Sequence, residues 1–186
     1  CANGTATALN VTASGTGTLS YQWYRNASNS TSGGTAVGTN AASYTPDINT
    51  AGTYYYYVTV TGTCGSATSS ATAVVVNAPP VITGTASSDI GTTSQLNGSG
   101  TPAASNAWVS SNTSVATVNG TGLVTGVTAG IATITYTNNQ GCSTSVNFVV
   151  SAYNYYVWTG DASTAWNNTA NWSSGAVPDG TTKVSI

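Results

Sequence analysis

The stretch AGTYYYYVTV, residues 51–60, decides the fold of this chain. Aromatic and β-branched residues alternate along it with a period of two, which places Tyr54 and Tyr56 on one face and Tyr55 and Tyr57 on the other. Such alternation, entered at an Ala-Gly pair, predicts one long β-strand.

A second strand is predicted upstream at YQWY, residues 21–24, with Trp23 as its one large apolar residue. A Trp on an early strand and a Gly-x-Tyr entry to a late strand are typical of an immunoglobulin-type sandwich. There the Trp fills the space between two sheets, and the Tyr hydroxyl binds back to the preceding corner. We therefore predict Trp23 and Tyr54 as core anchors, with Trp108 as the anchor of a second such unit.

Composition limits the class of protein. The chain has 186 residues, room for one large or two ordinary β domains. Only 3% of the residues are charged, with a net charge of −2, so we expect no nucleic-acid partner and no basic membrane patch. No apolar run approaches the ~20 residues of a membrane span. We expect a secreted protein whose surface is kept wet by hydroxyl and amide groups.

The connector NAPP, residues 77–80, divides the chain. The predicted fold is all-β, with tandem immunoglobulin-like β-sandwiches at residues 1–77 and 78–151 and a short C-terminal β segment. This Trp-rich segment, residues 152–186, is too short to bury a core alone. We expect it to be incomplete or docked on a neighbour. Because the chain begins at Cys1, without a leader, we interpret it as part of a longer exported protein.

The second half carries a specific resemblance. Short strand candidates include residues 115–118 and 123–125 on either side of an Asn119-Gly120 hairpin signal, and a turn is predicted at residues 138–141. Residues ~79–151 closely resemble the group 2 bacterial Ig-like domain of intimin- and invasin-type adhesins. The motifs that carry the resemblance are WVSSN (108–112), SVATV (114–118), GLVTGV (122–127) and AG before IATI (129–134).

The first half resembles the Ig-like repeats of giant surface proteins exported by the type IX secretion system. The motifs are YQWY (21–24), AGTY (51–54) and CGS (64–66). Residues 152–186 are similar to a segment that opens repetitive β domains in the same exported proteins. These resemblances imply a spacer or adhesive stalk on the bacterial surface, with no catalytic residues to carry over.

Three cysteines leave one unpaired in any intramolecular scheme. Cys1 and Cys64 bracket the first module, which favours an oxidising compartment and a Cys1–Cys64 bridge. Against this, a simple sandwich places the two residues at opposite ends, and a bridge needs Cα atoms within ~7 Å. The resemblance implies a partner for Cys142 near Asp89, where this chain has no cysteine, so Cys142 is left free or intermolecular.

Few residues of the chain are of the types that act in catalysis or bind metals. There is no His, Glu or CxxC pattern, and the four aspartates are isolated: Asp47, Asp89, Asp161 and Asp179. Asp161 and Asp179 are the only candidates for a glycosidase pair, and both read more simply as turn residues. We expect no enzyme activity, no cofactor and no metal.

The aromatic residues leave two readings open. Trp158, Trp166 and Trp172 either stack on a sugar or form a small core with Tyr155 and Tyr156.

Tyr55 and Tyr57, on the second face of the long strand, either grip a ligand or cover the sheet. Nine Asn-x-Ser/Thr sequons would accept glycans in a glycoprotein.

Three functions follow as hypotheses. The first is a non-catalytic structural or adhesive stalk of a secreted or cell-surface bacterial protein, with neighbouring modules, copies of itself or surface glycans as partners. The second is an extracellular filament subunit, assembled by strand addition between copies. The third is a carbohydrate-binding accessory module.

Overall fold

The computed structural model describes residues 1–152, 155–173, 177–178 and 183–185. The chain is all-β, as predicted, and the one helical element among these residues is the short 3₁₀ turn η1, Thr169–Asn171. No helix in this part of the chain has the length and apolar character needed to cross a bilayer. The chain forms two units: Cys1–Val81 with Thr137–Ser143, and Ile82–Tyr136 with Thr144–Ile186.

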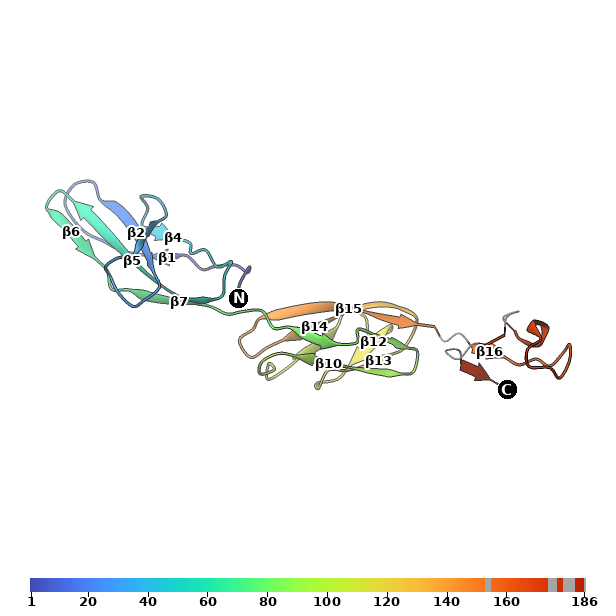
Figure 1. Ribbon diagram of the computed structural model, residues 1–186. Helices are drawn as coiled ribbons and strands as arrows, with labels where there is room; N and C mark the ends of the chain where they lie inside the picture. The colour runs from blue at the N-terminus through green and yellow to red at the C-terminus, as the bar shows by residue number, and fades with distance from the viewer. Residues whose placement is uncertain (153–154, 174–176, 179–182, 186) are drawn as a thin grey trace. The chain divides into compact units, whose positions relative to one another are not determined.

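The first unit is a sandwich built on β5 (Gly52–Gly62), the strand predicted from the tyrosine run. β5 lies beside β2 in the order β3-β2-β5-β6, and β7 also pairs with β5 (Figure 1). The other strands of this sheet are β2 (Ser20–Asn26), β3 (Thr35–Val37), β6 (Gly65–Thr68) and β7 (Thr72–Val76). A two-stranded sheet of β1 (Leu9–Asn10) and β4 (Ser43–Tyr44) forms the second layer.

Trp23 fills the space between these layers. It is 4% exposed and lies opposite Val58 on β5. Its ring is 6.0 Å from the ring of Tyr44 on the other sheet, and its indole N–H donates to the Ala41 carbonyl at 2.9 Å. Burying both the ring and its one polar atom in this way is what a core Trp requires.

Tyr54 closes the corner that leads into β5. Its hydroxyl donates to the Thr50 carbonyl at 3.2 Å. The ring itself is only half-buried, beneath the Arg25 guanidinium, 4.0 Å from the ring centroid. The central place in the core falls instead to Tyr56, which is 1% exposed.

The second unit is a sandwich of two four-stranded sheets. One sheet has the order β12-β13-β10-β8, from Ala116–Val118, Leu123–Gly126, Thr93–Gly98 and Ile82–Gly84. The other has the order β11-β14-β15-β9, from Trp108–Ser110, Gly130–Thr137, Ser143–Ser151 and Ser87–Asp89. The strands predicted at residues 115–118 and 123–125 correspond to β12 and β13, except that Val115 lies in the turn before β12. β9 was not predicted, since Ser87, Ser88 and Asp89 show no apolar alternation, and it exists through parallel pairing with β15.

Local signals place the core of this unit. Trp108 is 8% exposed and its ring lies 4.7 Å from that of Tyr136. The predicted hairpin joins β12 to β13, and the Asn119 side-chain oxygen accepts from the amides of Thr121 and Leu123. Gly122 ends the turn at φ +86°, where an added Cβ would lie 2.9 Å from the Trp108 ring. Only glycine suits both the left-handed backbone and this close approach.

The C-terminal segment contributes β16 (Tyr155–Val157) and β17 (Lys183–Ser185), which pair in parallel. The turn η1 lies between them in the chain.

Candidate functional site

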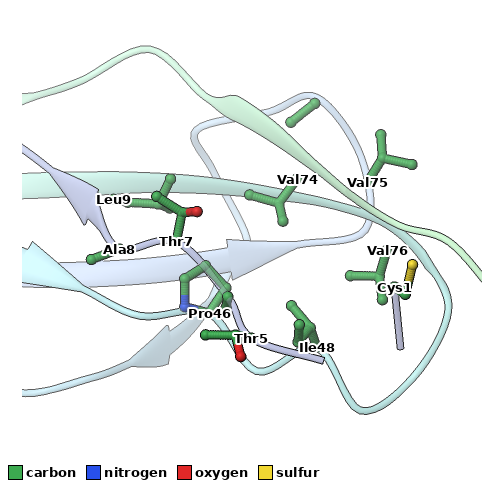
Figure 2. A pocket seen from close by; sticks show the side chains of 12 residues that line it. Cys1, Thr5, Thr7, Ala8, Leu9, Pro46, Ile48, Val74, Val75 and Val76 are labelled. Carbon is green, nitrogen blue, oxygen red and sulfur yellow. The ribbon is translucent and has the colours of Figure 1, made fainter. Parts of the chain in front are cut away.

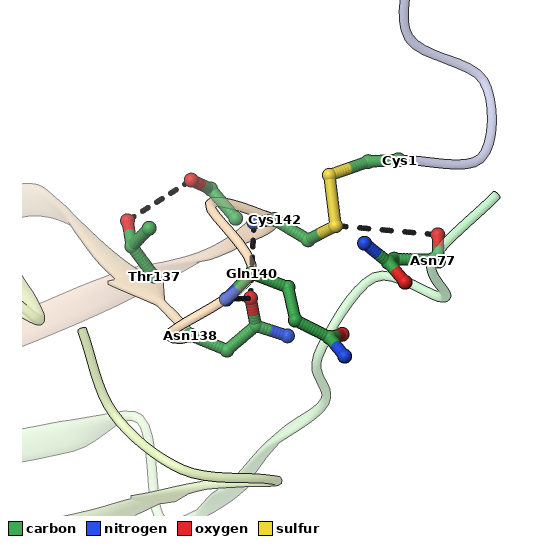
Figure 3. The surroundings of a disulfide bond; sticks show 7 residues. Cys1, Asn77, Thr137, Asn138, Gln140 and Cys142 are labelled. Atoms are coloured by element: carbon green, nitrogen blue, oxygen red, sulfur yellow. Dashed lines mark hydrogen bonds between the residues drawn. A yellow bond between two sulfur atoms is a disulfide. The ribbon is translucent and has the colours of Figure 1, made fainter. Parts of the chain in front are cut away.

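The structure joins Cys1 to Cys142, with Cα atoms 5.5 Å apart (Figure 3). The predicted Cys1–Cys64 bridge is therefore wrong, as is the expectation that Cys142 is free or intermolecular, and Cys64 is a free, exposed thiol. The reason lies along β5, where the ladder pairs Gly52 with Val76 at one end and Gly62 with Gly65 at the other. Ten residues of strand rise about 33 Å.

Cys1 lies at the end of β5 away from Cys64. The amide of Ala2 donates to the Asn77 carbonyl at 2.8 Å, and that of Asn3 donates to the Ile48 carbonyl at 3.0 Å. Both acceptors are close in the chain to the Gly52–Val76 pair. The Asn77 carbonyl oxygen also lies 4.0 Å from the Cys142 sulfur. Cys1 and Cys64 thus lie at opposite ends of the sandwich, which is the argument against their bridge that the sequence already provided.

Cys142 is held by the turn between β14 and β15. The Asn138 side-chain oxygen accepts from the amides of Gln140 at 3.1 Å and Cys142 at 3.0 Å. The Asn138 amide donates to the Cys142 carbonyl at 3.0 Å, and Gly141 adopts φ +76°. Cys142 itself is 1% exposed. The turn was predicted, whereas the role of Asn138 was not, although an Asn opening a turn that ends in Gly-Cys is a signal for it.

An open groove of about 310 Å³ lies between the segment Thr5–Leu9 and β7. Figure 2 shows Leu9, Ile48 and Val76 among the side chains around it. Every side chain that lines it is uncharged. A further hollow of about 230 Å³ continues past Leu9 toward Thr72 at the start of β7.

Backbone groups along this groove are unpaired. β7 pairs with β5 on one side, and within the described residues no strand pairs with its other side. Thr5, Ala6 and Thr7 make no backbone hydrogen bond in that same part of the chain. Val75 on this edge is 62% exposed. An open edge with free N–H and C=O groups and no charged side chain is a template for another strand.

The three C-terminal tryptophans pack on one another. The rings of Trp158 and Trp166 are stacked at 5.8 Å, and each meets Trp172 edge-on, at 5.1 and 4.5 Å. Trp172 is 3% exposed, whereas Trp166 is 50% exposed. The largest accessible ring of the three is therefore that of Trp166. The side chains of Tyr155 and Tyr156, named as part of the same predicted core, lie outside the described residues.

Asn171 holds this cluster together, a role that was not predicted from the sequence. Its side chain is 0% exposed. The side-chain oxygen accepts from the amides of Ala162 and Ser163, both at 2.9 Å. The side-chain nitrogen donates to the Ser163 hydroxyl at 3.1 Å and to the Ala165 carbonyl at 2.9 Å. A fully satisfied buried amide fixes the loop that carries the indoles.

Tyr57 is not available to a ligand. It is 4% exposed, stacked on Tyr24 with ring centroids 4.9 Å apart. Gly34, in the long connection after β2, lies so close that an added Cβ would be 2.9 Å from the Tyr57 hydroxyl. The connection covers this part of the face that the sequence placed outward. Tyr55 is half-buried.

The three aspartates that the structure describes form no common site. Among the described residues, no group of three or more His, Cys, Asp and Glu could hold a metal ion. Asp47 is exposed and accepts from the Asn49 amide at 2.9 Å, as a turn residue does. Asp89 lies on β9 and Asp161 is exposed, while Asp179 lies outside the described residues.

The free thiol of Cys64 has polar neighbours. The Thr16 hydroxyl lies 3.4 Å from its sulfur and the Thr63 hydroxyl 3.9 Å. Hydrogen bonds from Thr16 first, and then from Thr63, lower the pKa of this thiol. The thiol therefore ionises more readily than an ordinary exposed cysteine.

Comparison with known proteins matches each half of the chain to a family. Residues 81–148 match the model of the bacterial Ig-like domain (group 2), so this part is an Ig-like domain, as its motifs predicted. Residues 1–78 match the model of a domain of unknown function (DUF8696). A search of curated proteins found no match.

The comparison with solved structures also returned matches. One is the Bacteroides ovatus mixed-linkage glucan utilization locus protein SGBP-B in complex with a mixed-linkage heptasaccharide, at 15% identity and TM-score 0.32, covering 84% of this chain and 43% of that protein. Another is the S-layer protein rSbsC(31-844), at 22% identity and TM-score 0.29, covering 74% of this chain and 21% of the other. The chain thus spans less than half the length of either.

Proposed function

We propose that this chain is a non-catalytic spacer within an extracellular bacterial surface protein. The observation that carries the proposal is the Cys1–Cys142 bridge, which joins two residues 141 positions apart in the sequence. Bridges of this kind form and persist in oxidising surroundings outside the cytoplasm. The two β-sandwich units provide packed cores, and an Ig-like domain occupies most of the second.

The absence of catalysis is part of the same proposal. The chain has four carboxylates and no imidazole. Those on Asp47, Asp89 and Asp161 belong to separate turns or strands. Glycoside hydrolysis, for which the aspartates were considered, uses two carboxyl groups on either side of one substrate bond.

Cys64 allows a direct test of the location. Intact cells that carry the protein are treated with a membrane-impermeant maleimide, and peptides are mapped without reduction. We expect the label on Cys64 and an unlabelled Cys1–Cys142 peptide pair. Label found only after lysis, or free thiols at Cys1 and Cys142, would contradict an extracellular location.

A replacement experiment tests the spacer role. Residues 1–151 are exchanged for an unrelated two-domain β-sandwich segment of similar length, and adhesion of the cells to their usual surface is measured. A spacer is interchangeable, so adhesion is expected to be retained. Loss of adhesion with the chain still on the surface would assign the contact to residues 1–151 themselves.

The groove favours a second candidate function, strand addition between copies to form a filament. Its support is the uncharged, unpaired edge of β7 opposite Thr5–Thr7. A head-to-tail contact that does not close produces a fibre. Replacement of Val75 by Lys places a charge on this edge and is expected to abolish assembly seen by electron microscopy, while Val109→Lys on the second unit leaves it intact. Fibres that persist in both variants would exclude this route.

A further inference from the structure

The covalent connection from Cys1 to Ser151 is short when followed through the bridge. It runs from Cys1 across one disulfide to Cys142 and then along β15, Ser143–Ser151. Residues 2–141 form a closed loop attached to this path at both ends. A pull applied at residue 1 and beyond Ser151 therefore passes through the bridge and β15, and the loop carries no tension.

The backbone of β15 is already close to its fully extended length. A strand rises about 3.3 Å per residue, and a fully stretched chain spans at most about 3.3–3.6 Å per residue. A pull along the nine residues of β15 can therefore lengthen it by at most about a tenth, roughly 3 Å. Since so little slack is available, tension along this strand does not require its hydrogen bonds to break.

β15 is also firmly seated. It is a central strand, between β14 and β9, and its Phe148 and Val150 side chains are 0% and 2% exposed. On its outer face, side-chain hydrogen bonds join it to β14. They are Thr137 to Ser143 at 3.0 Å, Thr135 to Ser145 at 2.9 Å and Thr133 to Asn147 at 3.2 Å.

We propose that the Cys1–Cys142 bridge and β15 together form an inextensible tension path that protects both units from mechanical unfolding. The loop that hangs from this path contains the whole of the first sandwich and every strand of the second except β15. In the reduced chain, the same pull passes through residues 2–141 in series, and both units unfold and lengthen.

Reduction of the Cys1–Cys142 disulfide breaks this tension path. A dithiol transfers two electrons and two protons to the bridge, which becomes the thiols of Cys1 and Cys142, and the dithiol is itself oxidised to a disulfide. The inference deepens the proposed spacer function, because a spacer of fixed length holds its cargo at a fixed distance under load. The mechanical property belongs to the chain alone and does not depend on where the protein resides.

Single-molecule force spectroscopy tests the path. Handles are attached before Cys1 and after Ile186, and the full chain is stretched with and without a dithiol. In the oxidised protein, only the 35 residues after Ser151 can lengthen, by roughly 130 Å at about 3.6 Å per residue. In the reduced protein, the 151 residues up to Ser151 add on the order of 500 Å. Oxidised molecules that release that additional length would overturn the proposal.

Two controls make the result specific. Cys64→Ser keeps the bridge and is expected to behave as the unaltered chain. A handle moved from the N-terminus to the exposed Asn112 places residues 112–142 under load, and steps of about 110 Å are expected in the oxidised protein. Their absence would mean that the second sandwich resists force by itself, and the path would then be unnecessary.

The bridge-free variant Cys142→Ser is expected to lengthen without reductant. Should it fail to fold, reduction of the unaltered chain while it is tethered gives the same comparison on one molecule. The maleimide labelling of cells reports location alone. A failure of the surface proposal and a failure of the tension path therefore remain distinguishable.

Discussion

The side-chain oxygen of Asn138 accepts a hydrogen bond from the amide of Cys142 at 3.0 Å, and both residues are buried. The same oxygen accepts from the Gln140 amide. Replacing Asn138 by Ala leaves two amides without this acceptor, so we expect a loss of about 1–3 kcal/mol in the free energy of unfolding. Urea denaturation measures it. Asn139→Ala, at the exposed neighbouring position, is the matched control, and an equal loss there would contradict the role of Asn138.

The bridge itself should dominate stability. Its 141-residue separation corresponds to about 5 kcal/mol of unfolded-state entropy in the chain-entropy description. We expect the urea midpoint of the unaltered chain to fall strongly in dithiothreitol, and the double variant Cys1→Ser, Cys142→Ser to match the reduced chain. Cys64→Ser should match the oxidised chain. A reductant effect that survives in the double variant would point to something other than this bridge.

The Cys64 thiol is expected to react selectively. Its pKa is lowered by the hydrogen bond from Thr16 and then by that from Thr63, so a larger fraction is thiolate near neutral pH. Thr16→Val should slow alkylation by iodoacetamide at pH 7, and the difference should vanish at strongly alkaline pH, where the thiol is ionised in both proteins. Thr18→Val is the control. Equal rates for all three proteins at pH 7 would contradict the prediction.

Tyr56 makes stability depend on alkaline pH. Burial raises its pKa, with a further increase from Tyr44. A phenol whose pKa is higher in the folded chain contributes stability that is fully present below the unfolded value, about pH 10, and is lost as the pH rises through the folded value. Unfolding measured from pH 8 to pH 11 should show this loss. Tyr56→Phe should weaken it, whereas Tyr55→Phe, which keeps Tyr56, should retain it.

Substitutions at two tryptophans of the C-terminal cluster test packing and binding separately. Trp172 is 3% exposed, and its replacement by Ala should cost about 3–5 kcal/mol of local stability. Trp166 is half exposed, so Trp166→Ala should leave the cluster largely folded. If the protein binds polysaccharide, retention in affinity electrophoresis should fall for Trp166→Ala. Retention unchanged by that substitution would remove the carbohydrate-binding hypothesis for this ring.

The features that were predicted correctly are local in the chain. The alternation at residues 51–60 became β5, and the Asn119-Gly120 signal became the β12–β13 hairpin. Trp23 lies between the sheets of its unit, where the pattern placed it. The strand and the hairpin depend on side chains within a few residues of one another, because period and turn chemistry are set by neighbouring backbone angles.

Tyr57 shows the limit of prediction from local side-chain alternation. Its alternation correctly placed it on the face opposite Tyr56, but the face was covered by Tyr24 and by the connection around Gly34. Strand β9 was missed for a related reason, since Ser87–Asp89 becomes a strand only beside β15. Neither the cover nor the partner is encoded in the segment itself.

The sequence by itself determined an all-β chain with Trp-centred sandwiches, almost no charge and one cysteine in excess. The tertiary structure alone decided that Cys1 meets Cys142 and not Cys64, and that no strand among the described residues pairs with the outer edge of β7. Strand period is a property of adjacent residues, whereas a disulfide and a sheet edge depend on which distant segments the folded chain brings within a few ångströms.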